Sequence, residues 1–214
     1  MLEQTTRIVL IRHGETLWNR AARIQGHTDI PLSPLGRAQA ERLAQALADE
    51  PLAAIYASDL SRARQTAEAV ARPRGLAVRL HPGLRERCFG RFEGFSWDEI
   101  SQAHPEDAAR WRRREPDFAV GGGESLNDFS ARCVGAAQNI CAAHPGESIA
   151  LVAHGGVLDC LYRAAARIAL DAPRSWMLGN ASINRLLATP DGFSLVGWND
   201  EAHLLGLSTD DVAA

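Results

Sequence analysis

Basic side chains follow two apolar runs of the chain, at the points where we expect buried strands to end. The run Ile8–Ile11 leads directly into Arg12 and His13, and another apolar run leads into His154. A neutral imidazole can attack phosphorus and hold it covalently, which divides one difficult transfer into two easier steps. Arginine can make forked hydrogen bonds to the non-bridging oxygens of a phosphoryl group. These residue types suggest phosphoryl transfer, with His13 as the candidate nucleophile and Arg12 as a phosphate ligand.

Three further residues could take part in the same chemistry. Arg62 follows another predicted strand and could bind the same phosphate. His154 would add a second imidazole as a donor, and Gly155 beside it would let the backbone approach closely. Glu86 is the candidate general acid for the leaving alkoxide, because nearby phosphate charge favours the protonated form of a carboxyl group.

The loop after the first strand supplies two amides, Asn19 and Gln25, which could donate to a phosphate oxygen. The remaining basic residues near these motifs have simpler interpretations. We expect Arg37 and Arg64 to be exposed helix positions. Ordinary surface or capping roles are expected for the other histidines, namely His27, His81, His104, His144 and His203.

The elements that must position these residues alternate along the chain. Periodicity predicts strands at 7–11, 53–57, 76–80 and 148–153. It predicts helices that start at Ser33-Pro34 and that cover 59–71, 124–143 and 157–170. This alternation predicts an α/β fold with a mostly parallel sheet and helices on both faces, a three-layer α/β/α sandwich.

The parallel sheet would bring the candidate residues together. The carboxyl ends of parallel strands share one edge of the sheet, which is where ligands bind in open α/β folds. A helix that begins there points free N–H groups at an anion. The shared edge is stronger evidence for a phosphate site than any single motif.

Two segments depart from the alternation. Two strands at about 183–188 and 193–198, joined by a Pro190-Asp191-Gly192 turn, predict a hairpin and hence an antiparallel strand at the edge of the sheet. Residues 81–123 are too long for a plain connection and are interpreted as a helical insertion that forms a lid. The whole chain, 1–214, is expected to be one domain.

Composition limits the partners. The net charge of −3 argues against a general nucleic-acid or membrane-surface binder. No apolar run approaches the roughly 20 residues that span a bilayer, and nothing at the N-terminus resembles a signal peptide. Cysteines 88, 133, 141 and 160 have no zinc spacing, so reduced thiols in a cytoplasmic protein are expected. A homodimer through an exposed edge strand or helix stays open.

Three other patterns have interpretations that do not involve the predicted chemistry. A metal site on His13 and His154 is disfavoured, because no carboxylate spacing accompanies them and the neighbouring arginines would repel a dication. The run Gly121–Gly123 lacks the G-x-G-x-x-G order of a nucleotide loop and is interpreted as the flexible start of a helix. The basic run Arg110–Arg114 could be a solvated helical face or a second anion contact from the lid, and the solvated face is favoured.

The motifs together resemble the histidine phosphatase superfamily, in the branch that includes cofactor-dependent phosphoglycerate mutases and related cytoplasmic phosphatases. They occur in the family's order over nearly the whole chain. They are LIRHGETLWN at 10–19, GHTDIPLSPLG at 26–36, SDLSRARQTAE at 58–68, LRERCFGRFEG at 84–94, GGES at 122–125 and VAHGG at 152–156.

The resemblance implies a three-layer fold, no metal or other cofactor, and phosphorylation of His13. It also implies a phosphate pocket made of Arg12, Arg62 and His154, supported by Asn19, with Glu86 as the proton donor. For Glu86 the resemblance is the main support.

The resemblance leaves the acceptor of the phosphoryl group open. Mutases of the branch carry a His and a Tyr where this chain has Cys88 and Phe89, whereas FGRFEG at 89–94 looks more like the phosphatases. A phosphomonoesterase acting on a small phosphate monoester is therefore expected. A 2,3-bisphosphoglycerate-dependent phosphoglycerate mutase is the alternative, and a weakly active module that only binds phosphorylated ligands also stays open.

Overall fold

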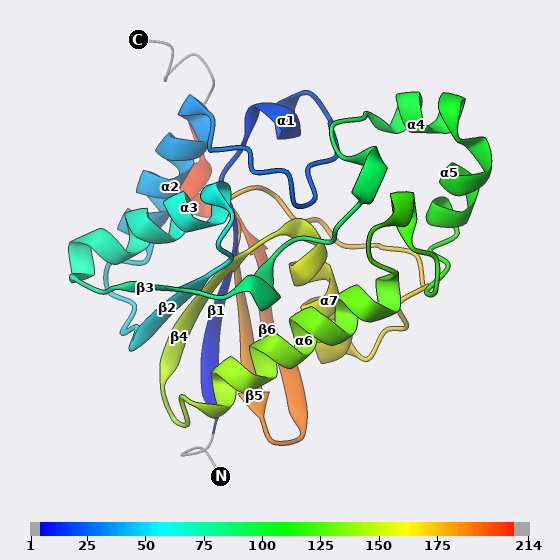
Figure 1. The fold of residues 1–214 in the computed structure, drawn as a ribbon. Coiled ribbons are helices and arrows are strands. Elements are labelled where there is room, and N and C mark those ends of the chain that lie inside the picture. Colours follow the sequence, from blue (N-terminus) through cyan, green and yellow to red (C-terminus); the bar gives the residue numbers. More distant parts are fainter. Residues whose placement is uncertain (1–4, 208–214) are drawn as a thin grey trace.

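The computed structural model describes residues 5–207, which contain one six-stranded sheet (Figure 1). The strands lie in the order β3-β2-β4-β1-β5-β6. Strands β1 to β4 pair in parallel, whereas β5 is antiparallel to β1 and β6 is antiparallel to β5. The mostly parallel sheet with its antiparallel hairpin at one edge is confirmed. The bounds are β1 (Thr6–Arg12), β2 (Ala54–Ala57), β3 (Val78–Leu80), β4 (Ser148–Ala153), β5 (Ile183–Thr189) and β6 (Gly192–Asp200).

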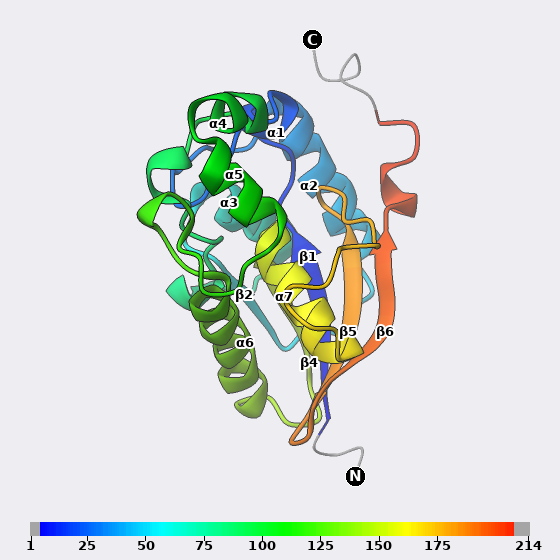
Figure 2. The same ribbon diagram turned by 90° about the vertical axis from the view of Figure 1, so that its right-hand side faces the viewer.

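Helices cover both faces of the sheet, as predicted (Figures 1 and 2). On one face, α2 (Pro34–Ala46) and α3 (Ser61–Ala71) pack on alternate strand residues that include Val9 and Ile55. On the other face, α6 (Leu126–Ala142) and α7 (Gly155–Ala166) pack on the intervening residues, among them Leu10 and Leu151. All of β4 is buried. Burial on both faces explains why β1, β2 and β4 read as largely apolar runs, whereas the edge strand β3 is more exposed.

The helix boundaries differ from the predictions where capping decides them. Helix α2 begins as expected, because the Ser33 hydroxyl accepts a hydrogen bond from the Gly36 N–H at 3.0 Å. Helix α7 begins at Gly155 and not at 157, so both glycines belong to its first turn. It ends at Ala166, before the predicted 170, where Arg167 adopts a left-handed conformation. A short helix, α1 (Leu17–Arg20), was not predicted; Thr16 caps it.

The insertion at 81–123 contains α4 (Trp97–Ala103), α5 (Pro105–Arg112) and several 3-10 turns. It stands beside the carboxyl edge of the sheet, at the upper right of Figure 1. Phe92, Ile100 and Phe118 form a small core of its own. Gly121 lies in a 3-10 turn, Val120–Gly122, and not in the start of a helix; its left-handed φ of 61° requires little side-chain bulk.

Two further findings concern membrane-spanning helices and disulfide bonds. No helix within residues 5–207 combines the length and apolarity needed to cross a membrane. The four cysteines are free thiols.

Candidate active site

His13 follows β1 directly and is buried, with 3% of its surface exposed. The backbone N–H of His13 donates to the Ala153 carbonyl at 3.0 Å, which holds His13 next to the end of β4. The ring nitrogen Nδ1 lies 2.7 Å from the Gly14 carbonyl oxygen. A carbonyl oxygen only accepts, so Nδ1 carries the proton and Nε2 keeps a free lone pair. The ring is thus held in the tautomer that a nucleophile requires.

The surroundings also keep the His13 ring neutral. Burial lowers its pKa well below 6.5, and the positive charges of Arg62 and Arg12 lower it further. The hydrogen bond to Gly14 opposes these effects but is the smallest of them. The His13 ring is therefore neutral at pH 6.5 and above, with Nε2 unprotonated and able to attack.

Arg12 and Arg62 flank this ring from two different elements. Arg12 ends β1, and its Nη1 donates to the Leu178 carbonyl at 2.6 Å. Arg62 lies in the first turn of α3 with 1% of its surface exposed. Its two terminal nitrogens donate to the carbonyls of Gly26 at 2.7 Å and Thr28 at 3.0 Å. These backbone contacts fix the guanidinium groups without neutralising their charge.

His154 and Gly155 join β4 to α7. The His154 ring is fully buried, and its centroid lies 5.1 Å from that of His13. Burial lowers the pKa of His154 well below its usual 6.5, and the positive charges of Arg62 and Arg12 add to this effect. A Cβ placed on Gly155 would lie 3.6 Å from Arg12 Nε. The first turn of α7 therefore faces the arginine, as a helix N-terminus that receives an anion would.

Four buried nitrogens in this region lack partners. Arg12 Nε, Arg62 Nε and both ring nitrogens of His154 make no hydrogen bond within residues 5–207. Buried polar groups are almost always paired, and an unpaired one costs about 1–3 kcal/mol. They belong to residues that neighbour His13, which indicates that a polar, acceptor-rich and negatively charged group belongs there.

Glu86 is held at the edge of this cluster. Its Oε2 accepts from the Gly156 N–H in the first turn of α7 at 3.0 Å, and its Oε1 accepts from the Arg87 N–H at 2.9 Å. Burial lowers the pKa of both Arg12 and Arg62, and the charge of Glu86 partly opposes that effect. Glu86 is thus an acidic group in electrostatic contact with both arginines.

The two predicted amides follow β1, Asn19 in the short helix α1 and Gln25 in the loop after that helix. Asn19 Oδ1 accepts from the Thr16 N–H at 3.0 Å, which leaves its Nδ2 to donate elsewhere. Gln25 is buried, and its Oε1 lies 3.0 Å from the Thr16 hydroxyl. The structure thus connects both amides through Thr16, next to the end of β1.

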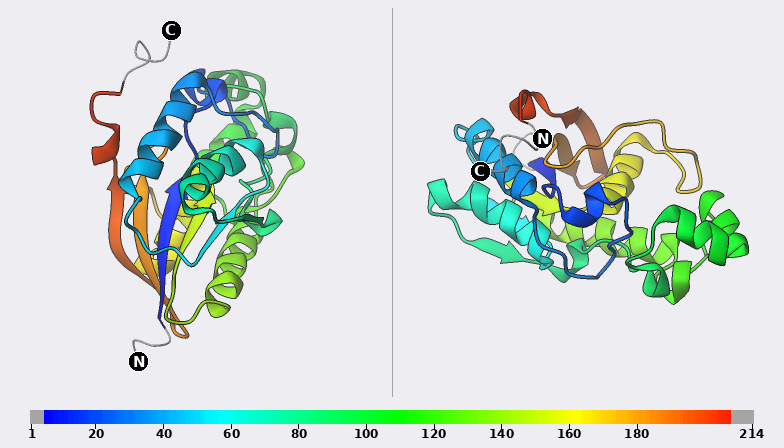
Figure 3. Two further views of the ribbon diagram at one scale, coloured as in Figure 1. Left: turned by 90° about the vertical axis from the view of Figure 1, so that its left-hand side faces the viewer. Right: turned by 90° about the horizontal axis from the view of Figure 1, so that it is seen from above.

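Sequence reasoning missed Asn180, which joins two of the candidate residues. Its Nδ2 donates to the His13 carbonyl at 3.0 Å and lies 3.4 Å from Asn19 Oδ1. Asn180 belongs to the loop 167–182, whose first residues were predicted as the end of a helix at 157–170 and for whose remainder no element was predicted. Figure 3 shows this loop, the α1 region and the insertion around the carboxyl edge when the molecule is seen from above.

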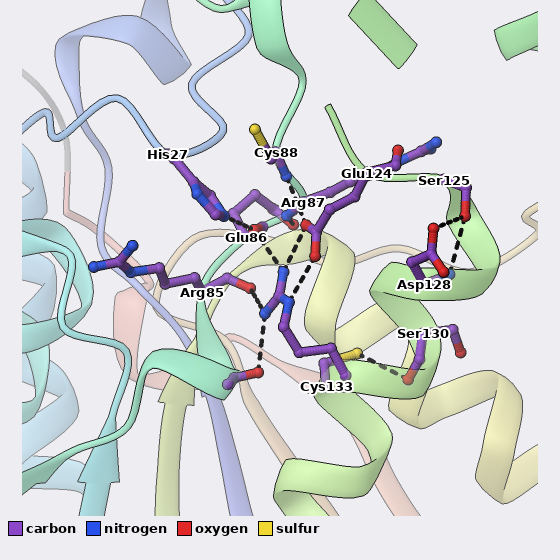
Figure 4. Close-up of polar contacts among 12 residues, drawn as sticks. His27, Arg85, Glu86, Arg87, Cys88, Glu124, Ser125, Asp128, Ser130 and Cys133 are labelled. Atoms are coloured by element: carbon purple, nitrogen blue, oxygen red, sulfur yellow. Dashed lines mark hydrogen bonds and ion pairs between the residues drawn. The ribbon is translucent and has the colours of Figure 1, made fainter. Parts of the chain in front are cut away.

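A second missed residue, Arg132 on α6, holds the segment that carries Glu86. Its guanidinium donates to the carbonyls of Gly83, Arg85 and Glu86 at 3.0–3.1 Å. It also pairs at 2.7 Å with Glu124, which accepts from the Cys88 N–H. In Figure 4, Glu86 lies between His27 and Glu124. The motif GGES therefore supplies, in Glu124, a support for the Glu86 segment.

One expectation about the other histidines was wrong. His27 is half-buried, and its Nε2 donates to the Glu86 carbonyl at 2.9 Å, so it supports the site instead of facing solvent. His144 is also buried, between Tyr56 and Glu147. His81 caps a 3-10 turn, as expected. The sequence around His27 and His144 contains no local pattern that would have predicted these contacts with distant residues.

Arg37 and Arg64 are exposed, as predicted. In the basic run of the insertion, Arg110 and Arg113 pair with Glu115 at the surface, which agrees with a solvated face. Arg114 differs, because its side chain points to Asp159 on α7. Within residues 5–207, no three His, Cys, Asp or Glu side chains are grouped so that they could hold a metal ion.

Fold and site together define a class: an α/β/α protein whose parallel-strand edge holds paired histidines and arginines arranged for phosphoryl chemistry. The sequence profile of the histidine phosphatase superfamily (branch 1) matches residues 8–201. The chain belongs to this superfamily, which confirms the resemblance.

Individual relatives agree with this membership. A phosphoglycerate mutase-like protein 4 of Arabidopsis thaliana is 39% identical, over 92% of this chain and 86% of its own length. A metal-independent phosphoserine phosphatase of the same plant is 36% identical, over 94% and 84%. The structure of a mycobacterial glucosyl-3-phosphoglycerate phosphatase covers 92% of this chain and 100% of its own, with a TM-score of 0.82 and 32% identity.

Buried Arg62 and exposed Arg64 lie on the same helix, and we expect only Arg62 to contribute to anion binding. Replacing buried Arg62 by Met is expected to weaken binding of orthovanadate or inorganic phosphate by about 10–100-fold, since it removes charge-assisted hydrogen bonds. Replacing exposed Arg64 by Met should leave binding unchanged. Calorimetric titration measures both, and thermal unfolding checks that each variant is folded. Equal affinities for the two variants would show that Arg62 does not bind the anion.

Proposed function

We propose that this protein is a metal-independent phosphomonoesterase that acts on small phosphorylated metabolites through a phosphohistidine at His13. The observation that carries this proposal is the set of unpartnered buried nitrogens around a neutral, tautomerically fixed imidazole. Membership of the histidine phosphatase superfamily and the relatives named as phosphatases support it.

In the first step, His13 Nε2 forms a bond to phosphorus as the bond between phosphorus and the ester oxygen breaks. Arg12, Arg62 and His154 would donate to the non-bridging oxygens, whose charge must be stabilised in the transition state. Glu86 would transfer a proton to the leaving oxygen, which departs as an alcohol.

In the second step, water attacks the phosphohistidine. Glu86, now a carboxylate, accepts a proton from this water as the new P–O bond forms and the P–N bond breaks. Inorganic phosphate leaves, and His13 is neutral again. The general acid of one step is the general base of the other, so the cycle closes without a cofactor.

Hydrolysis is favoured over mutase activity by the residues at the start of the insertion. Where the resembling mutases carry a tyrosine, Phe89 offers no hydroxyl group, and its ring stacks on Trp111 with centroids 5.0 Å apart. Mutase activity is the second candidate, supported by the relative named as mutase-like. A module that only binds would need neither a fixed nucleophile nor an acid beside it.

The test is release of inorganic phosphate from a panel of monoesters in the presence of a chelator. The panel includes phosphoserine, 3-phosphoglycerate and glycerol phosphate, and isomerisation of 3-phosphoglycerate is followed with 2,3-bisphosphoglycerate added. Chelator-resistant hydrolysis that exceeds isomerisation is expected. Isomerisation far faster than hydrolysis would instead identify a mutase, and no turnover of any ester would identify a binding module.

A further inference from the structure

A cluster of arginines surrounds a single carboxylate on α7. Asp159 Oδ2 accepts from Arg163 Nε at 2.9 Å and from Arg114 Nη2 at 3.1 Å. Arg174 Nε lies 3.8 Å from the other carboxylate oxygen, Oδ1. The three arginines come from α7, from the end of the insertion and from the loop 167–182. One negative charge therefore faces three positive ones.

The other contacts of these arginines do not neutralise them. Their remaining hydrogen bonds go to backbone carbonyls, of Leu170 for Arg114, of Ala169 for Arg163 and of Trp176 for Arg174. Arg163 is 1% exposed, and its Nη2 has no partner within residues 5–207. A backbone carbonyl can accept a hydrogen bond from an arginine but carries no net charge. The cluster therefore keeps an excess of positive charge.

This cluster adjoins the candidate active site on the side of the general acid. Asp159 follows Gly155 by four residues, so both lie on one face of α7, about 6 Å apart along its axis. A Cβ on Gly155 would lie 4.0 Å from Glu86 Oε2. The loop that carries Arg174 also supplies the Leu178 carbonyl that holds Arg12. The charge of Arg174 also contributes to the lowered pKa of Arg12, after burial as the main cause, so Arg174 lies within electrostatic range of the candidate phosphate ligand.

Arg114 and Arg174 are the arginines of the cluster that solvent can reach. Their side chains are 25% and 37% exposed, against 1% for Arg163 and 9% for Asp159. Burial and the charges of Arg114 and Arg163 lower the pKa of Arg174, whereas Asp159 and Glu86 raise it. The effect of Glu86 agrees with the placement of Arg174 near the acid.

We propose that Arg174, assisted by Arg114, forms a subsite for a carboxylate on the leaving group, so that phosphate monoesters of hydroxy acids are the preferred substrates. The planar fork of a guanidinium group matches a carboxylate. This inference rests on the proposed phosphatase function and adds the substrate class to it.

The test compares esters that differ in the carboxylate. 3-Phosphoglycerate and glycerol phosphate differ only by a carboxylate in place of a hydroxymethyl group, and phosphoserine differs from phosphoethanolamine by its carboxylate. The wild-type protein is expected to prefer the carboxylate ester of each pair in kcat/KM. In an Arg174→Gln variant this preference should fall about 10-fold or more, mainly through KM, as expected for a lost hydrogen bond to a charged group. Arg174→Glu should reverse it.

Arg64→Gln, an exposed arginine on α3, is the matched control and should leave both ratios unchanged. If Arg174→Gln lowers both members of a pair equally, or changes neither, the subsite is wrong while the phosphatase function stands. If the wild-type protein hydrolyses no ester of either pair or of the wider panel, the proposed function itself fails.

Discussion

A His13→Ala variant is expected to lose phosphate release by a factor on the order of 10⁴ or more, because no other nucleophile occupies its place. The proposed phosphate ligands Arg12, Arg62 and His154 come from other positions and remain. The variant should therefore still bind orthovanadate or substrate, although it turns over almost none. Phosphate release under single-turnover and steady-state conditions measures the loss.

The control for His13→Ala is a second buried histidine far from the site. His144 packs between Tyr56 and Glu147, and a His144→Ala variant should retain activity even if its melting temperature falls. Comparing the two separates loss of the nucleophile from loss of packing. Phosphatase activity of His13→Ala within tenfold of the wild-type value would rule out His13 as the nucleophile.

Glu86→Gln is expected to lower kcat by about 10²–10⁴-fold for alkyl phosphates such as phosphoserine, because their alkoxide leaving groups need a proton. The loss should be far smaller for p-nitrophenyl phosphate, whose leaving group is stable as an anion. Glutamine can still accept from the Gly156 N–H through its carbonyl oxygen, although its NH2 group cannot accept from the Arg87 N–H as Glu86 Oε1 does.

The control for this variant is Glu68→Gln, an exposed position on α3, which should behave as the wild type with both esters. Equal losses on alkyl and aryl esters would argue that Glu86 positions the substrate and is not the proton donor. Dephosphorylation of the intermediate should also slow, since the same carboxyl group acts as the base in the second step.

The parallel sheet could be predicted from the sequence because its signals are local. Buried strands such as β4 are continuous apolar runs, and Ser33-Pro34 is a strong helix start. Arg12, His13 and His154 could be found for the same reason, since Arg12 ends such a strand and each histidine stands directly after one. The start of α7 was misplaced because its glycines, poor helix formers in general, serve here in the first turn beside Glu86.

The residues that sequence reasoning missed act through long-range contacts from positions without a periodic signal. Asn180 lies in a loop 167 residues after His13, and Arg132 is one polar position on a long helix. His27 was misjudged for the same reason, because its partner is a backbone carbonyl 59 residues away. Contacts of this kind follow from the tertiary fold and leave no spacing rule in the sequence.

The most direct test of the account is to trap the phosphorylated protein. The wild-type protein is mixed with ³²P-labelled substrate, quenched in alkali within a turnover, and digested to locate the label. The account predicts an alkali-stable, acid-labile phosphohistidine on the peptide that contains His13, and none in His13→Ala. Turnover without any labelled protein, or a label on another residue, would contradict it.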